Sequence, residues 1–337
     1  MKEKANARDA AQAAPPPAPP PPEVFESKKD VVSLEEVIEA LQQLGELPAM
    51  RAVLGAFQRI GVARLEQLMH YLLKTGEPGA YDEFGFEPEA LDRVEPIAKW
   101  FHDHYFRVES KGIENIPAEG RVLLVANHSG TLPYDGAMVV STIRIQHPAH
   151  RRVRTLVEDF IYHLPYLGSF MSRVGAVRAC QENAQRLLEN DQATLVFPEG
   201  VKGIGKLFSK RYRLQRFGRG GALKLAAATH APIVPVSIVG AEESMPLLSK
   251  VSWLARPLGL PYIPITPTMP LLGPLGLLPL PTKWFIDFGP VMDLSEYDPE
   301  ALQHDRVLLN RLNEELRTTV QAMIDARLTT RKSVVFG

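Results

Sequence analysis

Short apolar runs alternate along the chain with stretches in which apolar residues recur every three or four positions. The runs at 122–126, 193–197 and 232–239 are the most apolar, and runs of this length predict buried strands. The stretches between them have the spacing of amphipathic helices. Strands that alternate with helices favour an α/β fold, with a mixed, largely parallel sheet flanked by helices. Further strands are predicted at 151–157, 173–178 and 284–288, and helices at 87–106, 133–143, 182–188, 219–228 and 299–327.

The first hundred residues follow a different pattern. Residues 1–30 are rich in alanine and proline and bury too little apolar surface to offset the entropy of ordering, which predicts a disordered tail. Residues 31–106 show helical spacing that begins with a capping sequence at Ser33–Glu36. These helices have mixed basic and apolar faces, so they either pack on the main domain or lie on a bilayer. The main domain is expected to span residues 107–337.

An unusual apolar segment lies late in the chain. Residues 257–282 carry no charge and contain eight prolines. Each proline removes a backbone donor, so this segment cannot form a spanning helix. We expect an apolar loop that covers an acyl chain or touches lipid, and packing inside the core is the alternative. No run of about twenty apolar residues is free of proline, so no transmembrane helix is predicted.

Composition narrows the classes of function. A net charge of −1 argues against a nucleic-acid partner. The single cysteine, Cys180, excludes an internal disulfide and is expected to be a buried structural thiol. The N-terminus lacks the apolar segment of a secretory signal, so a cytoplasmic protein is expected, attached peripherally to a membrane. His102 and His104 do not share a helix face, so a surface position without a metal is expected for them, and no cofactor is predicted.

The polar residues after the first long strand are the main candidates for chemistry. His128 follows the run at 122–126, and Asp135 lies inside the next predicted helix. An imidazole takes up a proton near neutral pH, and a carboxylate on its other nitrogen fixes the tautomer and stabilises the cation. This pairing suits activation of a hydroxyl for attack on an acyl group. A serine hydrolase is less suitable because no Gly-x-Ser-x-Gly elbow is present, and no nucleotide-binding fingerprint is found either.

A basic run follows Gly200. No acidic residue occurs between Gly200 and Ala241. A run of one sign beside strand-end glycines, in a nearly neutral protein, predicts a site for phosphates or acidic headgroups, and a solvated loop is the alternative. Lys202 and Lys206 are the nearest candidates. The cations of the run are Lys202, Lys206, Lys210, Arg211, Arg213, Arg216, Arg219 and Lys224.

Three sequence blocks together resemble one known family. The blocks are Asn127-His128 with Asp135, Phe197-Pro198-Glu199-Gly200, and Val234-Pro235-Val236. In order and spacing they resemble the lysophospholipid/glycerol-phosphate acyltransferase family, over about residues 105–290. The resemblance implies the glycerolipid acyltransferase fold and transfer of a fatty acyl group from acyl-CoA or acyl carrier protein. The acceptor would be the hydroxyl of a lysophospholipid or of a mono- or diacylglycerol.

The resemblance also implies roles for individual residues. His128 would be the general base that deprotonates the hydroxyl, and Asp135 would orient it. Glu199 and Gly200 would bind the acceptor, and Arg178, which ends a block similar to the family's arginine block, would bind its headgroup. Backbone N–H groups near Gly200 are candidates for stabilising the oxyanion.

The spacing of the first block departs from the family pattern. Six residues separate His128 from Asp135, whereas the family usually has four, and the longer spacing is similar to the neutral-glyceride branch. Gly130 and Pro133 could form a bulged turn that returns Asp135 to the imidazole. The alternative is a catalytically inactive lipid-binding protein with the same fold.

Overall fold

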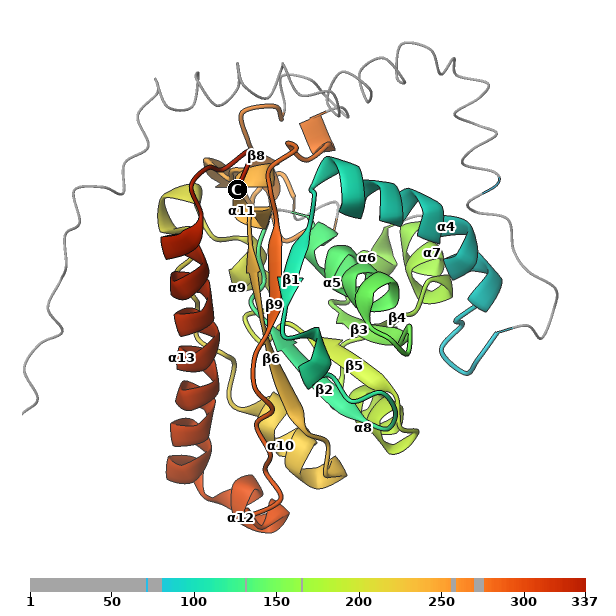
Figure 1. Ribbon diagram of the computed structural model, residues 1–337, viewed down its shortest axis with the longest axis vertical. Helices are drawn as coiled ribbons and strands as arrows, with labels where there is room; N and C mark the ends of the chain where they lie inside the picture. Colours follow the sequence, from blue (N-terminus) through green and yellow to red (C-terminus); the bar gives the residue numbers. More distant parts are fainter. Residues whose placement is uncertain (1–70, 72–80, 131, 165, 256–258, 270–275) are drawn as a thin grey trace, which may run out of the picture.

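A seven-stranded sheet forms the centre of the molecule in the computed structural model, which describes residues 71, 81–130, 132–164, 166–255, 259–269 and 276–337 (Figure 1). The predicted tail at 1–30 and most of the helical region at 31–106 lie outside the described residues. The strand order is β1-β9-β6-β2-β5-β3-β4. The strands are β1 (Glu109–Lys111), β2 (Val122–Ala126), β3 (Val153–Val157), β4 (Ala176–Arg178), β5 (Ala193–Val196), β6 (Ile233–Val239) and β9 (Phe285–Phe288).

Most neighbouring strands of this sheet run parallel. β6, β2, β5, β3 and β4 share one direction, while β9 pairs antiparallel with β6 and carries β1 parallel to itself at the edge. The predicted mixed, largely parallel sheet flanked by helices is therefore confirmed. A second, two-stranded sheet pairs β7 (Ser249–Val251) with β8 (Ile263–Ile265).

Helices cover both faces of the sheet. They are α4 (Pro88–Trp100), α5 (Tyr134–Gln146), α6 (Phe160–His163), α7 (Leu167–Arg173), α8 (Gln181–Glu189), α9 (Val201–Ile204), α10 (Gly221–Thr229), α11 (Ala241–Ser244), α12 (Pro299–His304) and α13 (Arg306–Thr330). Three single turns join them: a π-helical turn at Phe101–Tyr105 and 3₁₀ turns at Ile113–Asn115 and Phe208–Lys210.

The side chains of the central strand β2 contribute to an apolar core on each face of the sheet. Leu123 and Val125 point into one core with side chains of α8, α10 and α13, whereas Val122, Leu124 and Ala126 point into a second core with α5. None of these five side chains is exposed. A strand covered on both sides reads as a continuous apolar run because successive side chains point to opposite faces.

Two predicted helices are interrupted. The helix predicted at 87–106 ends at Trp100 and continues as a π-helical turn. The helix predicted at 299–327 is two helices, since the Asp305 carboxylate accepts N–H bonds from Val307 and Leu308 and so begins α13 anew. Cys180, expected to be buried, is only partly covered.

The described end of the proline-rich segment packs on the protein. Tyr105 donates its hydroxyl to the carbonyl of Pro279 (2.6 Å), and Tyr134 donates to that of Leu277 (3.0 Å). For residues 276–282 the structure therefore favours packing on the core over contact with lipid. Among the residues that the structure describes, no helix combines the length and apolar character needed to cross a bilayer.

Candidate active site

Three adjacent parallel strands bring the candidate residues together. His128 follows β2, Glu199 follows β5, and Glu242 follows β6; β2 lies between the other two strands. In α/β sheets the carboxyl ends of parallel strands are where ligands bind. Asn127 fastens this end of the sheet, because its side chain donates to the Ile238 carbonyl (3.1 Å) and accepts from the Ile238 amide (2.7 Å).

His128 and Asp135 form a buried pair. Nδ1 of His128 lies 2.7 Å from Oδ2 of Asp135, whose side chain is fully buried. The same carboxylate accepts the amides of Ser129 and Gly136, both at 2.8 Å. A carboxylate that already accepts two backbone N–H bonds suits Nδ1 of His128 as a further donor, which leaves Nε2 as the ring nitrogen that does not contact Asp135.

The loop between the two residues shows how six intervening residues still permit this contact. Gly130, two residues after His128, adopts φ +85°, a left-handed conformation that glycine reaches without steric cost. Pro133 precedes the helix rather than starting it, so Asp135 falls in the first turn of α5. The partial positive charge of a helix N-terminus favours a carboxylate at that position. The contact between His128 and Asp135 that a bulged turn was expected to permit is therefore present.

An aromatic ring supports the imidazole from the other side. Phe197 stacks on the His128 ring, with a centroid separation of 4.3 Å and an interplanar angle of 24°. The His128 side chain is 11% exposed, so the imidazole is largely enclosed but not sealed. Sequence reasoning assigned no role to Phe197, although its position immediately before Pro198-Glu199 was the available signal.

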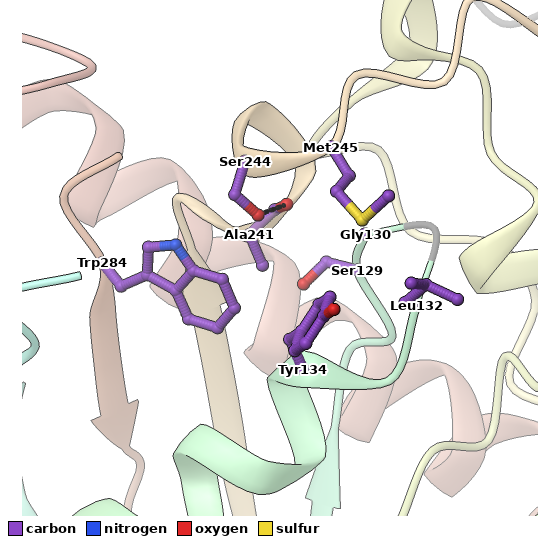
Figure 2. Close-up of a pocket in the computed structure, with 8 residues that line it drawn as sticks. All are labelled: Ser129, Gly130, Leu132, Tyr134, Ala241, Ser244, Met245 and Trp284. Atoms are coloured by element: carbon purple, nitrogen blue, oxygen red, sulfur yellow. Dashed lines mark hydrogen bonds between the residues drawn. The ribbon is translucent and has the colours of Figure 1, made fainter. Parts of the chain in front are cut away.

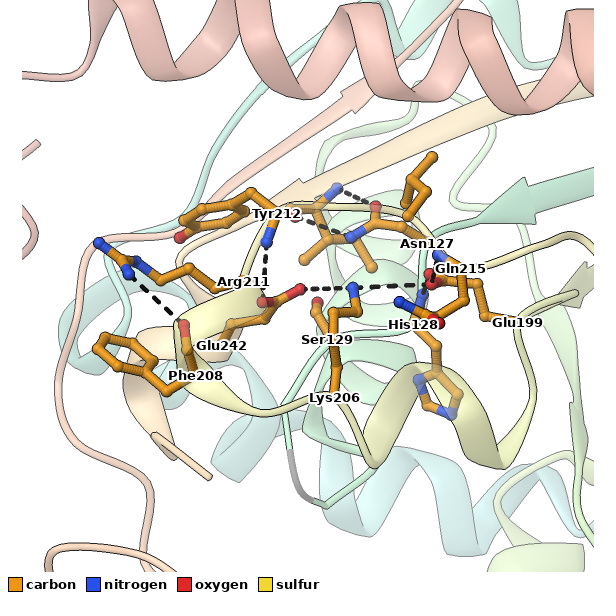
Figure 3. Close-up of polar contacts among 12 residues, drawn as sticks. Asn127, His128, Ser129, Glu199, Lys206, Phe208, Arg211, Tyr212, Gln215 and Glu242 are labelled. Carbon is orange, nitrogen blue, oxygen red and sulfur yellow. Dashed lines mark hydrogen bonds and ion pairs between the residues drawn. The ribbon is translucent and has the colours of Figure 1, made fainter. Parts of the chain in front are cut away.

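Glu199 holds the backbone of His128. Its side chain is fully buried, and its Oε1 accepts the His128 amide (3.0 Å) while Oε2 accepts the Gln215 amide (2.6 Å) (Figure 3). Gly200 follows with φ 54° and ψ −147°, a conformation open essentially to glycine alone. The Gly200 amide donates to the Phe197 carbonyl (3.0 Å), so this N–H is already used and is not a free oxyanion donor.

Lys206 lies between two carboxylates rather than at the surface. Its Nζ is 2.9 Å from Oε1 of Glu242 and 3.6 Å from Oε2 of Glu199, and its side chain is 2% exposed. Burial acts to lower the pKa of Lys206, but the two carboxylates raise it above its ordinary value. Burial raises the pKa of Glu242, and Lys206 opposes part of that rise. The expected phosphate contact of Lys206 therefore competes with two carboxylates, whereas Lys202 on α9 is exposed.

Arg178 lies apart from this centre. It ends β4, and β5 and β3 lie between that strand and β2 in the sheet. Its guanidinium donates to both oxygens of Asp159, at 2.5 and 2.8 Å, and both side chains are exposed. Asp159 immediately precedes α6, but its side chain makes no capping bond to that helix.

Two small pockets flank the turn after His128. The first, with about 140 Å³ of space that includes its opening to solvent, is lined by residues that include Ser129, Tyr134 and Trp284 (Figure 2). The Ser129 hydroxyl is buried there, without a hydrogen-bond partner among the described residues. The second, about 210 Å³, is lined by Lys206 and Glu242 and shares Gly130 and Met245 with the first.

The histidines considered for a metal site have other surroundings. His102 was expected at the surface but is buried, with Nδ1 2.6 Å from Asp103 and Nε2 3.3 Å from the Gln146 amide nitrogen. Burial lowers its pKa, and Asp103 opposes that effect. Within the described ranges, no three His, Cys, Asp or Glu side chains are grouped as metal ligands would be.

Comparisons with other proteins give one family model and several similar chains. The chain matches the Acyltransferase family model over residues 107–239. It is 47% identical over 257 residues to an uncharacterized protein of Mycobacterium tuberculosis (strain ATCC 25618 / H37Rv), covering 76% of this chain and 72% of that protein. A 46% identical relative from Mycobacterium leprae is matched over 76% of this chain and 70% of its own length.

Proteins whose names state an enzymatic activity are more distant from this chain. A chloroplastic 1-acyl-sn-glycerol-3-phosphate acyltransferase of Brassica napus is 24% identical over 153 residues, or 42% of this chain and 40% of that protein. The crystal structure of the 1-acyl-sn-glycerophosphate acyltransferase PlsC from Thermotoga maritima matches with a TM-score of 0.48 and 16% identity, over 86% of this chain and 97% of that one. On the family model and the extended mycobacterial matches, this chain belongs to the acyltransferase family of enzymes.

Proposed function

We propose that this enzyme transfers a fatty acyl group from a thioester, acyl-CoA or acyl carrier protein, to a hydroxyl of a glycerolipid. The observation that carries the proposal is the pair of His128 and buried Asp135, with Nδ1 and Oδ2 separated by 2.7 Å. The names of the Brassica and Thermotoga proteins make lysophosphatidic acid the first acceptor to test. Mono- and diacylglycerol are the alternatives that follow from the six-residue spacing.

In the proposed reaction His128 is both base and acid. Its Nε2 takes the proton of the acceptor hydroxyl as the hydroxyl oxygen attacks the thioester carbonyl. The C–S bond then breaks, and the imidazolium returns its proton to the departing thiolate. Asp135 stabilises the imidazolium between the two steps and keeps Nδ1 protonated, so Nε2 faces the substrate in the correct tautomer.

The other candidates have distinct proposed roles. Glu199 fixes the His128 backbone through the amide bond described above, and it acts on the base rather than on the acceptor. Lys202 is the exposed cation closest in sequence to Gly200 and is the proposed contact for a substrate phosphate. Arg178 becomes a headgroup contact only if its pair with Asp159 opens, so its contribution should appear in KM rather than in kcat.

The test is release of free thiol from palmitoyl-CoA, measured with lysophosphatidic acid, monoacylglycerol or diacylglycerol as acceptor. We expect release that depends on one acceptor and falls at least about a thousandfold in His128→Ala, since general base catalysis contributes up to ~10⁴-fold. His304→Ala, at the exposed end of α12, is the matched histidine control.

Two outcomes would contradict parts of the proposal. Turnover in folded His128→Ala that equals the wild type would remove the base mechanism. No thiol release from folded wild type, with palmitoyl-CoA or with palmitoyl-acyl carrier protein as donor, would favour the alternative of an inactive lipid-binding protein.

A further inference from the structure

A patch of exposed apolar side chains surrounds β7. Leu248, Trp253 and Leu254 are 54%, 74% and 48% exposed, and all three lie within seven consecutive residues. Lys250, in the strand between them, is also exposed. Single exposed apolar residues are ordinary, but three within seven residues, beside an exposed cation, make this stretch a candidate contact surface. We name Leu248, Trp253 and Leu254 the hairpin patch.

The hairpin patch lies one short helix away from the His128 base. Lys250 donates to the Gly205 carbonyl (3.1 Å), and Tyr262 donates its hydroxyl to the Ile204 carbonyl (2.8 Å), so the β7–β8 hairpin is fastened to α9. On its other side α9 touches the base, because a Cβ placed at Gly203 would lie 2.7 Å from Cβ of His128. In Figure 1, β8 and α11 lie at the same end of the molecule as the carboxyl ends of the parallel strands.

The exposed charged side chains of residues 200–286 are all cationic. Between residues 200 and 286 only Glu242 and Glu243 are acidic. Both are 7% exposed, and they pair with Lys206 and Arg331, respectively. The stretch therefore presents apolar and cationic side chains to water without an exposed carboxylate. Its exposed lysines are Lys202, Lys210 and Lys250.

An anionic bilayer is complementary to such a surface. Tryptophan is enriched at the membrane–water interface, where its ring sits among the headgroups. Lysines beside an apolar patch are attracted to anionic lipids. Two copies of this chain paired through the same surface would place lysine against lysine, because residues 200–286 contain no exposed carboxylate.

We propose that the hairpin patch docks the enzyme on anionic phospholipid bilayers, with Trp253 and Leu254 entering the headgroup region and the lysines facing lipid phosphates. This inference deepens the proposed function, because a glycerolipid acceptor must reach His128 from a bilayer. Docking through the hairpin brings α9, and the base behind it, to the lipid surface. The lipid contact expected of residues 257–282 is thereby assigned to the residues just before that segment.

The experiment is co-sedimentation of the full chain with vesicles of phosphatidylcholine alone or mixed with phosphatidylglycerol. We expect binding to the mixed vesicles that weakens as salt is added, and partitioning at least about tenfold weaker in Trp253→Ala/Leu254→Ala. Val307→Ala is the matched control, because Val307 is 80% exposed at the start of α13, at the opposite end of the molecule in Figure 1. Melting curves check that each variant is folded.

Tryptophan emission gives a second, local measurement. Of the three tryptophans, Trp253 is 74% exposed, Trp100 is half-buried at the end of α4 and Trp284 is fully buried, so a vesicle-induced blue shift should disappear in Trp253→Phe. Wild-type partitioning of the double variant, or a blue shift that persists in Trp253→Phe, would overturn the proposal. So would a change of oligomeric state in the double variant without loss of vesicle binding, because the hairpin patch would then be an interface between copies.

The two proposals fail in different ways. Acyl transfer to a monomeric, short-chain acceptor needs no bilayer, so its absence would count against the proposed function alone. If that transfer occurs while the wild type ignores every vesicle, the docking proposal is wrong and the proposed function remains.

Discussion

Replacing Lys206 by methionine would remove the ammonium that lies between two buried carboxylates. Glu242 and Glu199 have oxygens 2.9 and 3.6 Å from Nζ, and none of the three side chains is more than 7% exposed. Breaking a buried ion pair by deleting one partner costs about 3–5 kcal/mol, because the remaining charge is left without compensation. For a domain of this size each kcal/mol shifts Tm by about 2–4 °C, so we expect Lys206→Met to melt roughly 6–20 °C below the wild type.

The loss of stability in Lys206→Met should also depend on pH. The folded-state pKa of Glu242 is raised by burial above its ordinary value of 4.5, and removal of Lys206 raises it further. A carboxyl whose folded-state pKa is raised binds more protons in the folded than in the unfolded state. Stability therefore falls as the pH rises from the unfolded-state pKa to the folded-state pKa of this carboxyl. Urea unfolding should therefore show that Lys206→Met loses less unfolding free energy, relative to the wild type, at about pH 5 than at about pH 8.

Two variants control for other effects of the substitution. Lys210→Met removes an exposed cation from the same basic run and should change the free energy of unfolding by less than about 0.5 kcal/mol. Lys206→Met/Glu242→Gln removes one of the two stranded charges and should recover part of the loss. If Lys206→Met were as stable as Lys210→Met at both pH values, Lys206 would not be neutralising the buried carboxylates.

Three further substitutions test the site and its support. Asp135→Asn should lower kcat by roughly 10³–10⁴-fold with little change in KM, because the amide stabilises the wrong tautomer of His128; an unchanged kcat would exclude Asp135 as its partner. Gly203→Ala places a Cβ 2.7 Å from that of His128 and should lower kcat about 10–100-fold, whereas Gly221→Ala, whose Cβ would meet nothing within 4 Å, should not. Arg327→Leu breaks a largely buried pair with Asp287 and should cost about 3 kcal/mol by urea unfolding, and a cost near zero would show that solvent screens the pair.

The strands that carry the site could be predicted closely from the sequence. The run at 122–126 is β2 with the same bounds, and the runs at 193–197 and 232–239 each differ from their strands by one residue. These strands are buried on both faces, which leaves an uninterrupted apolar signal. β1 was missed because its three residues, Glu109–Lys111, are polar and too few to show a pattern.

The reversed direction of β9 has no local signal. A run as short as the four residues of β9 reads alike in a parallel and an antiparallel strand, and the direction is decided by which partner the strand meets. In this protein β9 meets β6, with Val236 opposite Phe288 and Val239 opposite Phe285.

The central contact of the candidate site was predictable from the sequence, whereas its supporting contacts were not. Contact between His128 and Asp135 was expected across the six-residue spacing, and the loop geometry brings it about. The partners of Lys206 were not foreseen, because Glu242 follows a different strand, 36 positions later. A basic run gives no sign of which member is buried, although two consecutive carboxylates, beginning three residues after a buried strand, were the available signal.

The place of β9 in the sheet has a consequence for synthesis of the chain. β6 has seven consecutive buried residues, and one of its edges is covered only when β9, more than forty residues later, has been made. A nascent or truncated chain that ends before Phe285 would expose an apolar strand with unpaired backbone groups, the kind of edge that recruits strands from other chains. Chains cut short in this region should therefore aggregate rather than form a smaller active enzyme, even though His128, Asp135, Glu199 and Lys206 would all be present.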